Sequence, residues 1–204
     1  MASPVLPSDL ARQDICRFLA ACYYEPTADF IEADLFGSLK AVADALDPEL
    51  RPAVERLEKA FAADDVETLL IDHTRLFIGP SRPLAIPYGS FWLAGDTSLM
   101  HDPAFSVTGF YEEGGFELDE SFRDLPDHVA VELEFLYVLF FGYNQARLTG
   151  DDTGTRERQA LGQRFLEAHL GKWLPAFAAA IRENARTGFY RALADLTERV
   201  VQKL

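Results

Sequence analysis

The chain is 204 residues long and 49% hydrophobic, which is enough for one domain with a sizeable core. It has 33 acidic and 19 basic residues, giving a formal net charge of -14. A field of this sign repels nucleic-acid phosphates and anionic membranes, and it attracts cationic partners such as basic peptides.

The amino terminus, the hydropathy pattern and the cysteines together indicate a cytoplasmic protein. The amino terminus has no basic stretch followed by an apolar run, and no apolar stretch reaches the ~20 residues of a membrane span. Cys16 and Cys22 match neither a zinc nor a redox spacing and are expected to be reduced core residues.

Apolar residues recur at helical spacing along the first third of the chain. Four helices are expected there: one from Ser8 to about Tyr24, then others beginning at Thr27, Pro48 and Asp64. Each begins with a residue that can cap the first turn or with a proline, which the first turn tolerates.

Residues 77–93 break this pattern, with three prolines between Gly79 and Gly89. Prolines this dense forbid a regular helix and favour an extended path. Because the segment is apolar, it is expected to pack on something. It is either a connection that covers the core or the wall of a groove, in which Tyr88 and Trp92 offer broad faces.

The stretch from Asp124 to Tyr143 organises the rest. It is predicted to be a helix capped by Asp124 or Asp127 and apolar almost all round, which is typical of a buried helix. Its first turns carry His128 and Glu132, which share a face. Two interpretations stay open: a cap plus a solvated helical pair, or an acidic, pH-sensitive binding mouth at the end of the core helix.

Beyond this helix, Thr149–Thr155 is polar and contains glycine, so it is expected to be an exposed, mobile loop and a candidate hinge. Helices are predicted again from Arg156, Trp173 and Thr187. No stretch alternates as a strand does. The predicted fold is all-α: a single-domain bundle of about eight to ten helices over residues 1–204.

Few residues suggest catalysis. No phosphate loop, dinucleotide fingerprint or nucleophile elbow occurs, so no cofactor is expected. His128 and Glu132 offer two metal ligands, and His101 with Asp102 resembles part of a metal phosphohydrolase site, but no full ligand set is visible. A metal-dependent hydrolase stays open as an alternative. So does a non-catalytic scaffold that bridges proteins through the proline-rich segment.

The residues themselves favour an acidic, aromatic-edged groove for a peptide that has apolar residues and basic flanks. Three ordered motifs add to this. The most specific is LPDHV followed by ELEFL at 125–136; the second is RLFIGP at 75–80 with PYGSFW at 87–92; the third, in the tail, is HL and WLP at 169–175 with FYRAL at 189–193. Together they resemble the signatures of the TorD/DmsD/NarJ-type redox-enzyme maturation chaperones.

The resemblance implies a cytosolic, all-helical protein that is not an enzyme. Such proteins bind the twin-arginine leader, or a related amino-terminal segment, of a molybdopterin oxidoreductase catalytic subunit, and hold it until its cofactor is in place before export. Carried over, Asp127 and His128 would lie at the leader-binding site, with Tyr88, Trp92 and Glu132 close by. The negative charge of this chain is complementary to such a leader, because the leader joins two guanidinium groups to an apolar segment.

Two further expectations concern the residue at position 89 and the oligomeric state. Gly89 stands where many relatives carry a larger, often acidic residue after the tyrosine. The expected hinge at Thr149–Thr155 would allow either a monomer or a dimer that exchanges helices.

Overall fold

The computed structural model of the chain describes residues 4–26, 35–79, 82–93, 103–119 and 124–204. Over these residues the protein is all-α, which confirms the predicted class, with ten α-helices and no β-strand. The helices are α1 (Pro7–Tyr23), α3 (Leu35–Leu46), α4 (Arg51–Phe61), α5 (Val66–His73), α6 (Gly89–Leu93), α7 (Pro103–Gly114), α8 (Val129–Thr149), α9 (Asp152–Ala168), α10 (Leu170–Asn184) and α11 (Gly188–Val201). Two shorter turns, η1 (Pro48–Leu50) and η2 (Thr74–Ile78), precede α4 and extend α5.

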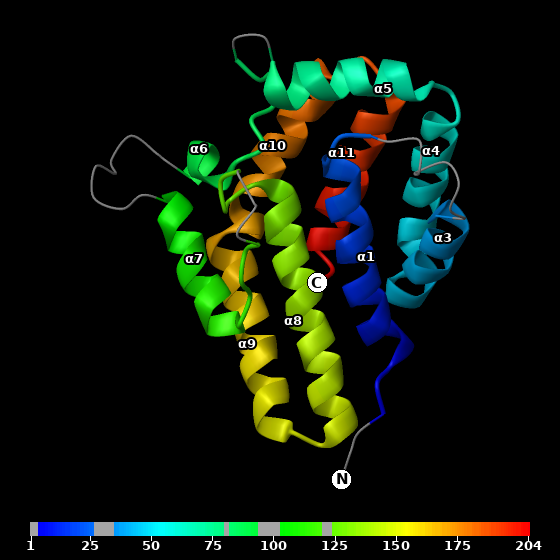
Figure 1. Cartoon of the computed structure of the whole chain (residues 1–204). Coiled ribbons are helices and arrows are strands. Elements are labelled where there is room, and N and C mark those ends of the chain that lie inside the picture. The colour runs from blue at the N-terminus through cyan, green and yellow to red at the C-terminus, as the bar shows by residue number, and fades with distance from the viewer. Residues whose placement is uncertain (1–3, 27–34, 80–81, 94–102, 120–123) are drawn as a thin grey trace.

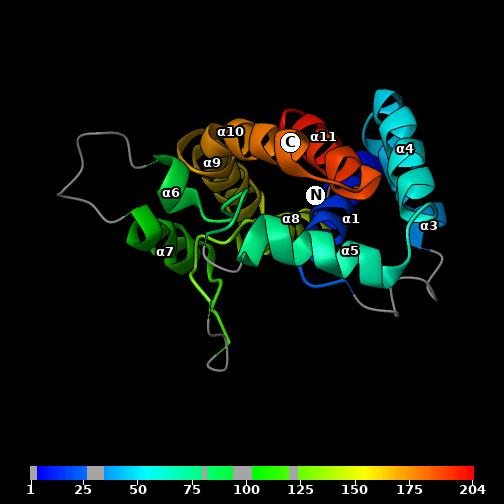
Figure 2. The same ribbon diagram turned by 90° about the horizontal axis from the view of Figure 1, so that it is seen from above.

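Helix α8 lies in the middle of the bundle, between α1 and α9, and packs against both (Figure 1). Beyond α1 lie α3 and α4, while α6 and α7 flank the opposite side. Seen from above, α5 runs across the upper end of the bundle, and α10 and α11 lie side by side behind α8 (Figure 2). The central place of α8 follows from its sequence, because a helix that is apolar almost all round has to be covered on several sides.

Helix α8 has 21 residues and buries much of its length. Val129, Leu133 and Leu136 are fully shielded from solvent, and Phe135 is buried with them. Over the part of the chain that the structure describes, no helix has both the length and the apolar character that a bilayer crossing needs.

The connection between α8 and α9 is shorter than predicted. Helix α8 ends at Thr149, Gly150 takes a left-handed conformation at φ +73°, and α9 already begins at Asp152. The reason is a cap: the Asp151 carboxylate accepts a hydrogen bond from the Gly154 amide at 2.9 Å, which stabilises the first turn. The expectation of a loop through residue 155 is therefore wrong in extent. Helix exchange across this turn stays a prediction.

Asp72 ties the upper end of the bundle together. Its buried carboxylate accepts hydrogen bonds from the Arg186 and Thr187 amides at 2.9 and 2.8 Å and from the Thr187 hydroxyl at 2.9 Å. Its other oxygen pairs with Arg75, whose guanidinium also donates to the Asn184 carbonyl. One acid of α5 thus binds the residues that precede α11 and holds the turn between α10 and α11.

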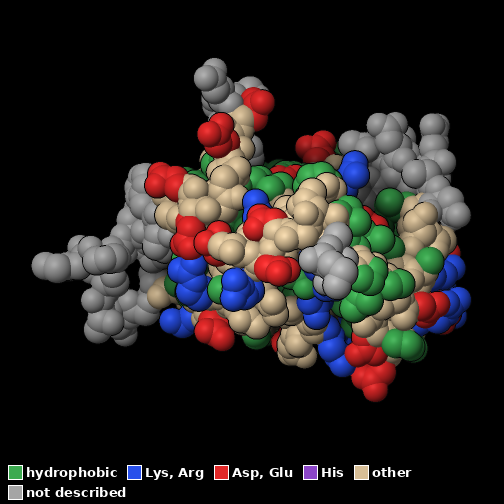
Figure 3. Space-filling model, turned by 90° about the horizontal axis from the view of Figure 1, so that it is seen from below, with side chains coloured by type: hydrophobic (Ala, Val, Ile, Leu, Met, Phe, Trp, Pro, Cys, Tyr) green, Lys and Arg blue, Asp and Glu red, His purple; other side chains and the backbone are tan. Residues whose placement is uncertain are grey.

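The lower end of the bundle has a mixed surface. Seen from below, acidic and basic side chains are interspersed, and hydrophobic side chains gather on one side (Figure 3). Leu6, Leu10 and Leu148, at the start of α1 and the end of α8, are each about half exposed. The net negative charge is therefore not a uniform coat over this face.

Candidate functional site

The end of the proline-rich segment pairs with the start of α8. Tyr88 and His128 form an isolated antiparallel bridge. On its two sides, the Gly89 amide donates to the Asp127 carbonyl at 2.9 Å and the Val129 amide donates to the Pro87 carbonyl at 2.8 Å. The pairing brings two of the three sequence motifs into contact, although they are about 40 residues apart in the chain. We call this the Tyr88–His128 bridge.

Asp127 supports the bridge from beneath. Its side chain is fully buried, and Oδ2 accepts a hydrogen bond from the Ser90 amide at 2.6 Å, in the first turn of α6. Its Oδ1 is shielded from solvent and has no described partner. The prediction that Asp124 or Asp127 caps α8 is wrong, because the Asp127 carboxylate is turned toward α6.

His128 is the cap of α8. Its Nδ1 accepts a hydrogen bond from the Ala130 amide at 3.2 Å. The ring stacks on Tyr24 at a centroid distance of 6.2 Å and meets the edge of Tyr88 at 5.5 Å. Burial lowers the pKa of His128, although the nearby Asp124 and Asp127 carboxylates act to raise it. The ring is therefore neutral at pH 7, as Nδ1 must be in order to accept.

Glu132 points into the core. Of the two interpretations left open, the solvated pair with His128 is wrong, because Glu132 has no exposed surface. Its two carboxylate oxygens accept from the Trp173 indole N–H at 3.3 and 3.2 Å, and Nδ1 of His169 lies 3.7 Å away. Burial raises the pKa of Glu132 to about 7, although His169 and Trp173 act to lower it.

His169 and Trp173 are thus neighbours of Glu132 that the sequence did not identify as its partners. A signal was present, since both residues belong to the tail motif at 169–175. What the sequence lacked was the packing of α10 against the start of α6, which carries that motif to the same place.

Gly89 lies between the Tyr88–His128 bridge and the buried pair of Glu132 and Trp173. A Cβ atom at Gly89 would lie 2.8 Å from Trp173 Nε1, closer than real side chains approach, and 3.0 Å from Glu132 Oε1, which is tighter than most real contacts. The departure from a larger residue at this position therefore has a steric reason in this chain.

Trp92 lies in the same segment but faces elsewhere. Its indole N–H donates to the Ile86 carbonyl at 2.8 Å, and its ring lies 6.5 Å from Phe177 of α10. Phe91 packs edge-on against it at 4.9 Å. The described contacts of Trp92 brace the loop against α10, whereas Tyr88 and His128 contact each other directly.

The surface outside the buried groups is aromatic, apolar and acidic. The Tyr88 hydroxyl donates to the exposed Asp124 carboxylate at 2.8 Å. Tyr24, which stacks on His128, is partly exposed, and its position at the end of α1 gave no signal in the sequence. The segments that form the bridge also expose Leu84, Phe91 and Leu125. Such a surface can pair with a cation and bury an apolar side chain.

The hydrolase alternative needs a metal-ligand set. Among the described residues, no group of three or more His, Cys, Asp or Glu side chains could hold a metal ion. His101 and Asp102 lie outside the described residues. His128 and Glu132, the other two ligands considered, are occupied by a helix cap and by Trp173.

Comparisons with known proteins agree with the motifs. The family model for the nitrate reductase delta subunit matches residues 43–179. The chain is 32% identical over 158 residues to the chaperone protein TorD of Photobacterium profundum, covering 73% of this chain and 70% of that protein. It is 28% identical over 197 residues to the TorD chaperone of Vibrio cholerae, covering 96% and 83%.

A solved structure from Archaeoglobus fulgidus, of a protein assigned to redox enzyme maturation, matches with a TM-score of 0.53 and 18% identity over 93% of both chains, which shows a shared fold. The relatives are named as chaperones, which are not enzymes. Since the family model spans more than half of its length, the chain belongs to the nitrate reductase delta subunit family, which includes the TorD-type redox-enzyme maturation chaperones that its motifs resemble.

Proposed function

We propose that the chain is a cytoplasmic chaperone that binds the twin-arginine leader, or a related amino-terminal segment, of a molybdopterin oxidoreductase catalytic subunit. It holds this segment until the cofactor has been inserted and export can begin. The Tyr88–His128 bridge carries the proposal, because it joins two family motifs beneath one aromatic and acidic surface.

The chemistry of a leader complements this surface. A guanidinium group can pair with the exposed Asp124 carboxylate and lie on the face of Tyr24 or Tyr88. The apolar part of a leader can cover Phe91 and Leu125, which are each nearly half exposed. The net charge of -14 attracts such a basic segment over longer distances.

The five predicted site residues then fall into two layers. Tyr88 and the edge of His128 contact the peptide, and Trp92 stiffens the loop beside them. Asp127 and Glu132 are fully buried and have no direct contact to the leader: Asp127 holds the Ser90 amide beside Tyr88, and Glu132 accepts from Trp173 in the core.

The proposal is tested with a labelled leader peptide from a molybdopterin oxidoreductase and a matched peptide in which both arginines are replaced by glutamine. Fluorescence anisotropy should show saturable binding of the first peptide, weakening from low to physiological salt because charge contributes. The glutamine peptide should bind at least tenfold more weakly. Equal binding of the two peptides would contradict the proposal and favour a scaffold that recognises some other surface.

Asp124→Asn locates the contact within the same experiment. It removes one exposed charge while keeping an oxygen that can accept from Tyr88, so we expect weaker leader binding at unchanged stability. Glu157→Gln is the control, because it removes the same charge from an exposed position of α9. If both variants lower affinity equally, the effect comes from net charge alone.

A further inference from the structure

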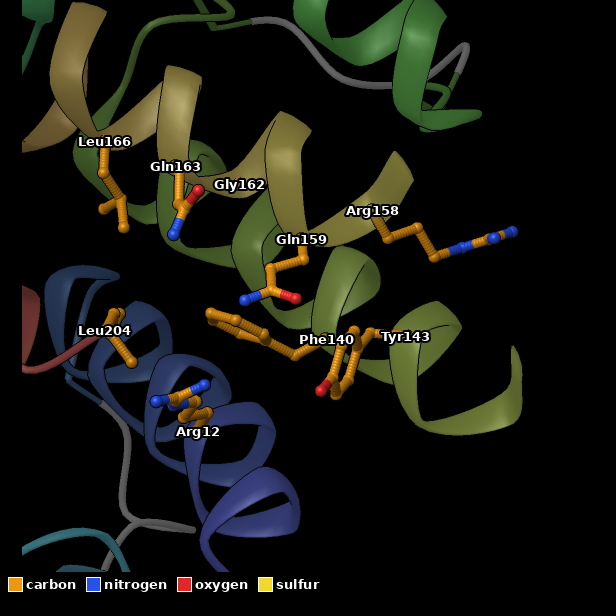
Figure 4. A pocket seen from close by; sticks show the side chains of 9 residues that line it. All are labelled: Arg12, Phe140, Tyr143, Arg158, Gln159, Gly162, Gln163, Leu166 and Leu204. Atoms are coloured by element: carbon orange, nitrogen blue, oxygen red, sulfur yellow. The ribbon is translucent and has the colours of Figure 1, made fainter. Parts of the chain in front are cut away.

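A second site lies between α1, α8 and α9, away from the Tyr88–His128 bridge. It is a pocket of about 100 Å³ whose lining includes Arg12, Phe140, Gln159 and Gln163 (Figure 4). Phe140 follows His128 by twelve residues, which is about 18 Å along the helix axis. The pocket therefore has no part in the leader-binding surface proposed above.

Arg12 is the unusual group in this pocket. Its side chain lines the pocket from α1, across from Phe140 and Gln159 (Figure 4). The Nε atom is shielded from solvent and donates to no acceptor among the described residues. A cationic N–H group that is removed from water without a partner costs free energy, so this position favours an acceptor that the protein itself does not supply.

The neighbouring polar groups are already engaged. Asp9, one turn before Arg12 on α1, pairs with Arg147 at 3.0 Å. The Tyr143 hydroxyl accepts from Arg147 at 3.1 Å. Arg158 donates to the Gly154 carbonyl and extends away from the pocket (Figure 4). Among the described residues, no carboxylate forms an ion pair with Arg12, and the nearby Asp9 is paired with Arg147 instead.

The other walls suit a small anion with some apolar character. Gln159 and Gln163, one turn apart on α9, extend into the same space and carry amide N–H donors (Figure 4). Phe140, Leu166 and Leu204 supply apolar surface. A cavity of ~150 Å³ admits benzene, so this smaller one is of a size to hold a short carboxylate or a phosphate.

We propose that this pocket binds a small oxyanion, held by the Arg12 guanidinium and the amides of Gln159 and Gln163. A guanidinium matches two oxygens of a carboxylate or a phosphate with two parallel hydrogen bonds, which gives the pocket its selectivity over chloride.

The test is a titration of the ¹⁵N-labelled protein with sodium propionate and, separately, with inorganic phosphate, against sodium chloride of equal ionic strength. The side-chain amide signals of Gln159 and Gln163 should shift saturably with at least one oxyanion and not with chloride. The anion that produces a saturable shift identifies whether the pocket binds carboxylates or phosphate. No saturable shift with either would mean that the pocket holds only water, and would overturn the proposal.

Variants separate this site from a general salt effect. Arg12→Gln should lower the affinity for the saturating anion at least tenfold. Arg12→Lys keeps the charge but loses the planar guanidinium, so its affinity should lie between those of the wild type and Arg12→Gln. Arg199→Gln is the control, since it removes the same charge from an exposed position of α11. Unchanged affinity in Arg12→Gln, with a native amide spectrum, would overturn the proposal; if that variant fails to fold, an unchanged affinity in Arg12→Lys would do so.

Discussion

His128 has two separate roles at one position: its Nδ1 caps α8, and its ring fills the space between Tyr24 and Tyr88. A histidine cap works only with a neutral ring, and burial provides this by lowering the pKa of the imidazole. The cap and the aromatic contacts can be tested apart, because asparagine also caps helices but has no ring.

His128→Ala should cost about 1 kcal/mol of unfolding free energy through the lost cap, plus the lost ring packing. His128→Asn should recover the part due to the cap. Urea denaturation measures both variants. If leader binding depends on the ring, both should lose affinity alike although their stabilities differ; full affinity in the asparagine variant would leave His128 with a structural role only.

Glu132 makes stability depend on pH. Its pKa is about 7 in the folded protein, against an ordinary value of 4.5. Between these two pH values the folded state holds a proton that the unfolded state has released, so the free energy of unfolding falls as pH rises through this window. With 1.36 kcal/mol for each pKa unit, the loss amounts to about 3 kcal/mol.

Glu132→Gln should remove this pH dependence of the free energy of unfolding. The variant stays neutral and can still accept from Trp173, so its stability relative to the wild type should increase from pH 5 to pH 8. His73 and His128, whose pKa values are lowered by burial, act in the opposite direction in both proteins and cancel in the difference. Thermal melts across this range provide the measurement, and a pH-independent difference would show that Glu132 is charged throughout.

At the level of whole elements, Asp72 joins α5 to the turn between α10 and α11. Asp72→Ala would leave the Arg186 and Thr187 amides and the Arg75 guanidinium without their buried acceptor. We expect a loss of about 3 kcal/mol, which calorimetry can measure. Asp195→Ala is the control, because its pair with Arg182 is substantially exposed and should cost less than 1 kcal/mol.

Helices were predictable where the apolar period was regular, and less so where a distant segment sets the boundary. The start of α8 was expected at Asp124 or Asp127 but lies at Val129, because the preceding residues pair with the proline-rich segment. The start of α9 was expected at Arg156 but lies at Asp152, because the Asp151 cap is local and was missed. Placing the start of α8 correctly requires tertiary information, whereas the start of α9 could have been found from the local sequence.

For the whole molecule, the all-α class and the family followed from periodicity and from three motifs, but the orientation of α8 did not. A helix that is apolar almost all round gives no face by which to orient Glu132, so the sequence left open whether Glu132 formed a solvated pair with His128 or lined a binding mouth. The pocket at Arg12 was likewise hidden, because its lining comes from α1, α8, α9 and Leu204 and no single segment carries its signature.

Gly89 links the outer surface to the interior of the protein. Because a methyl group there would meet Trp173 and Glu132 at once, the loop that carries the proposed leader-binding surface rests directly on the buried Glu132. A lineage that rebuilds this loop to accept a different cargo must also repack the acid and the indole beneath it. Altered selectivity and altered acid tolerance would then arise in the same evolutionary step.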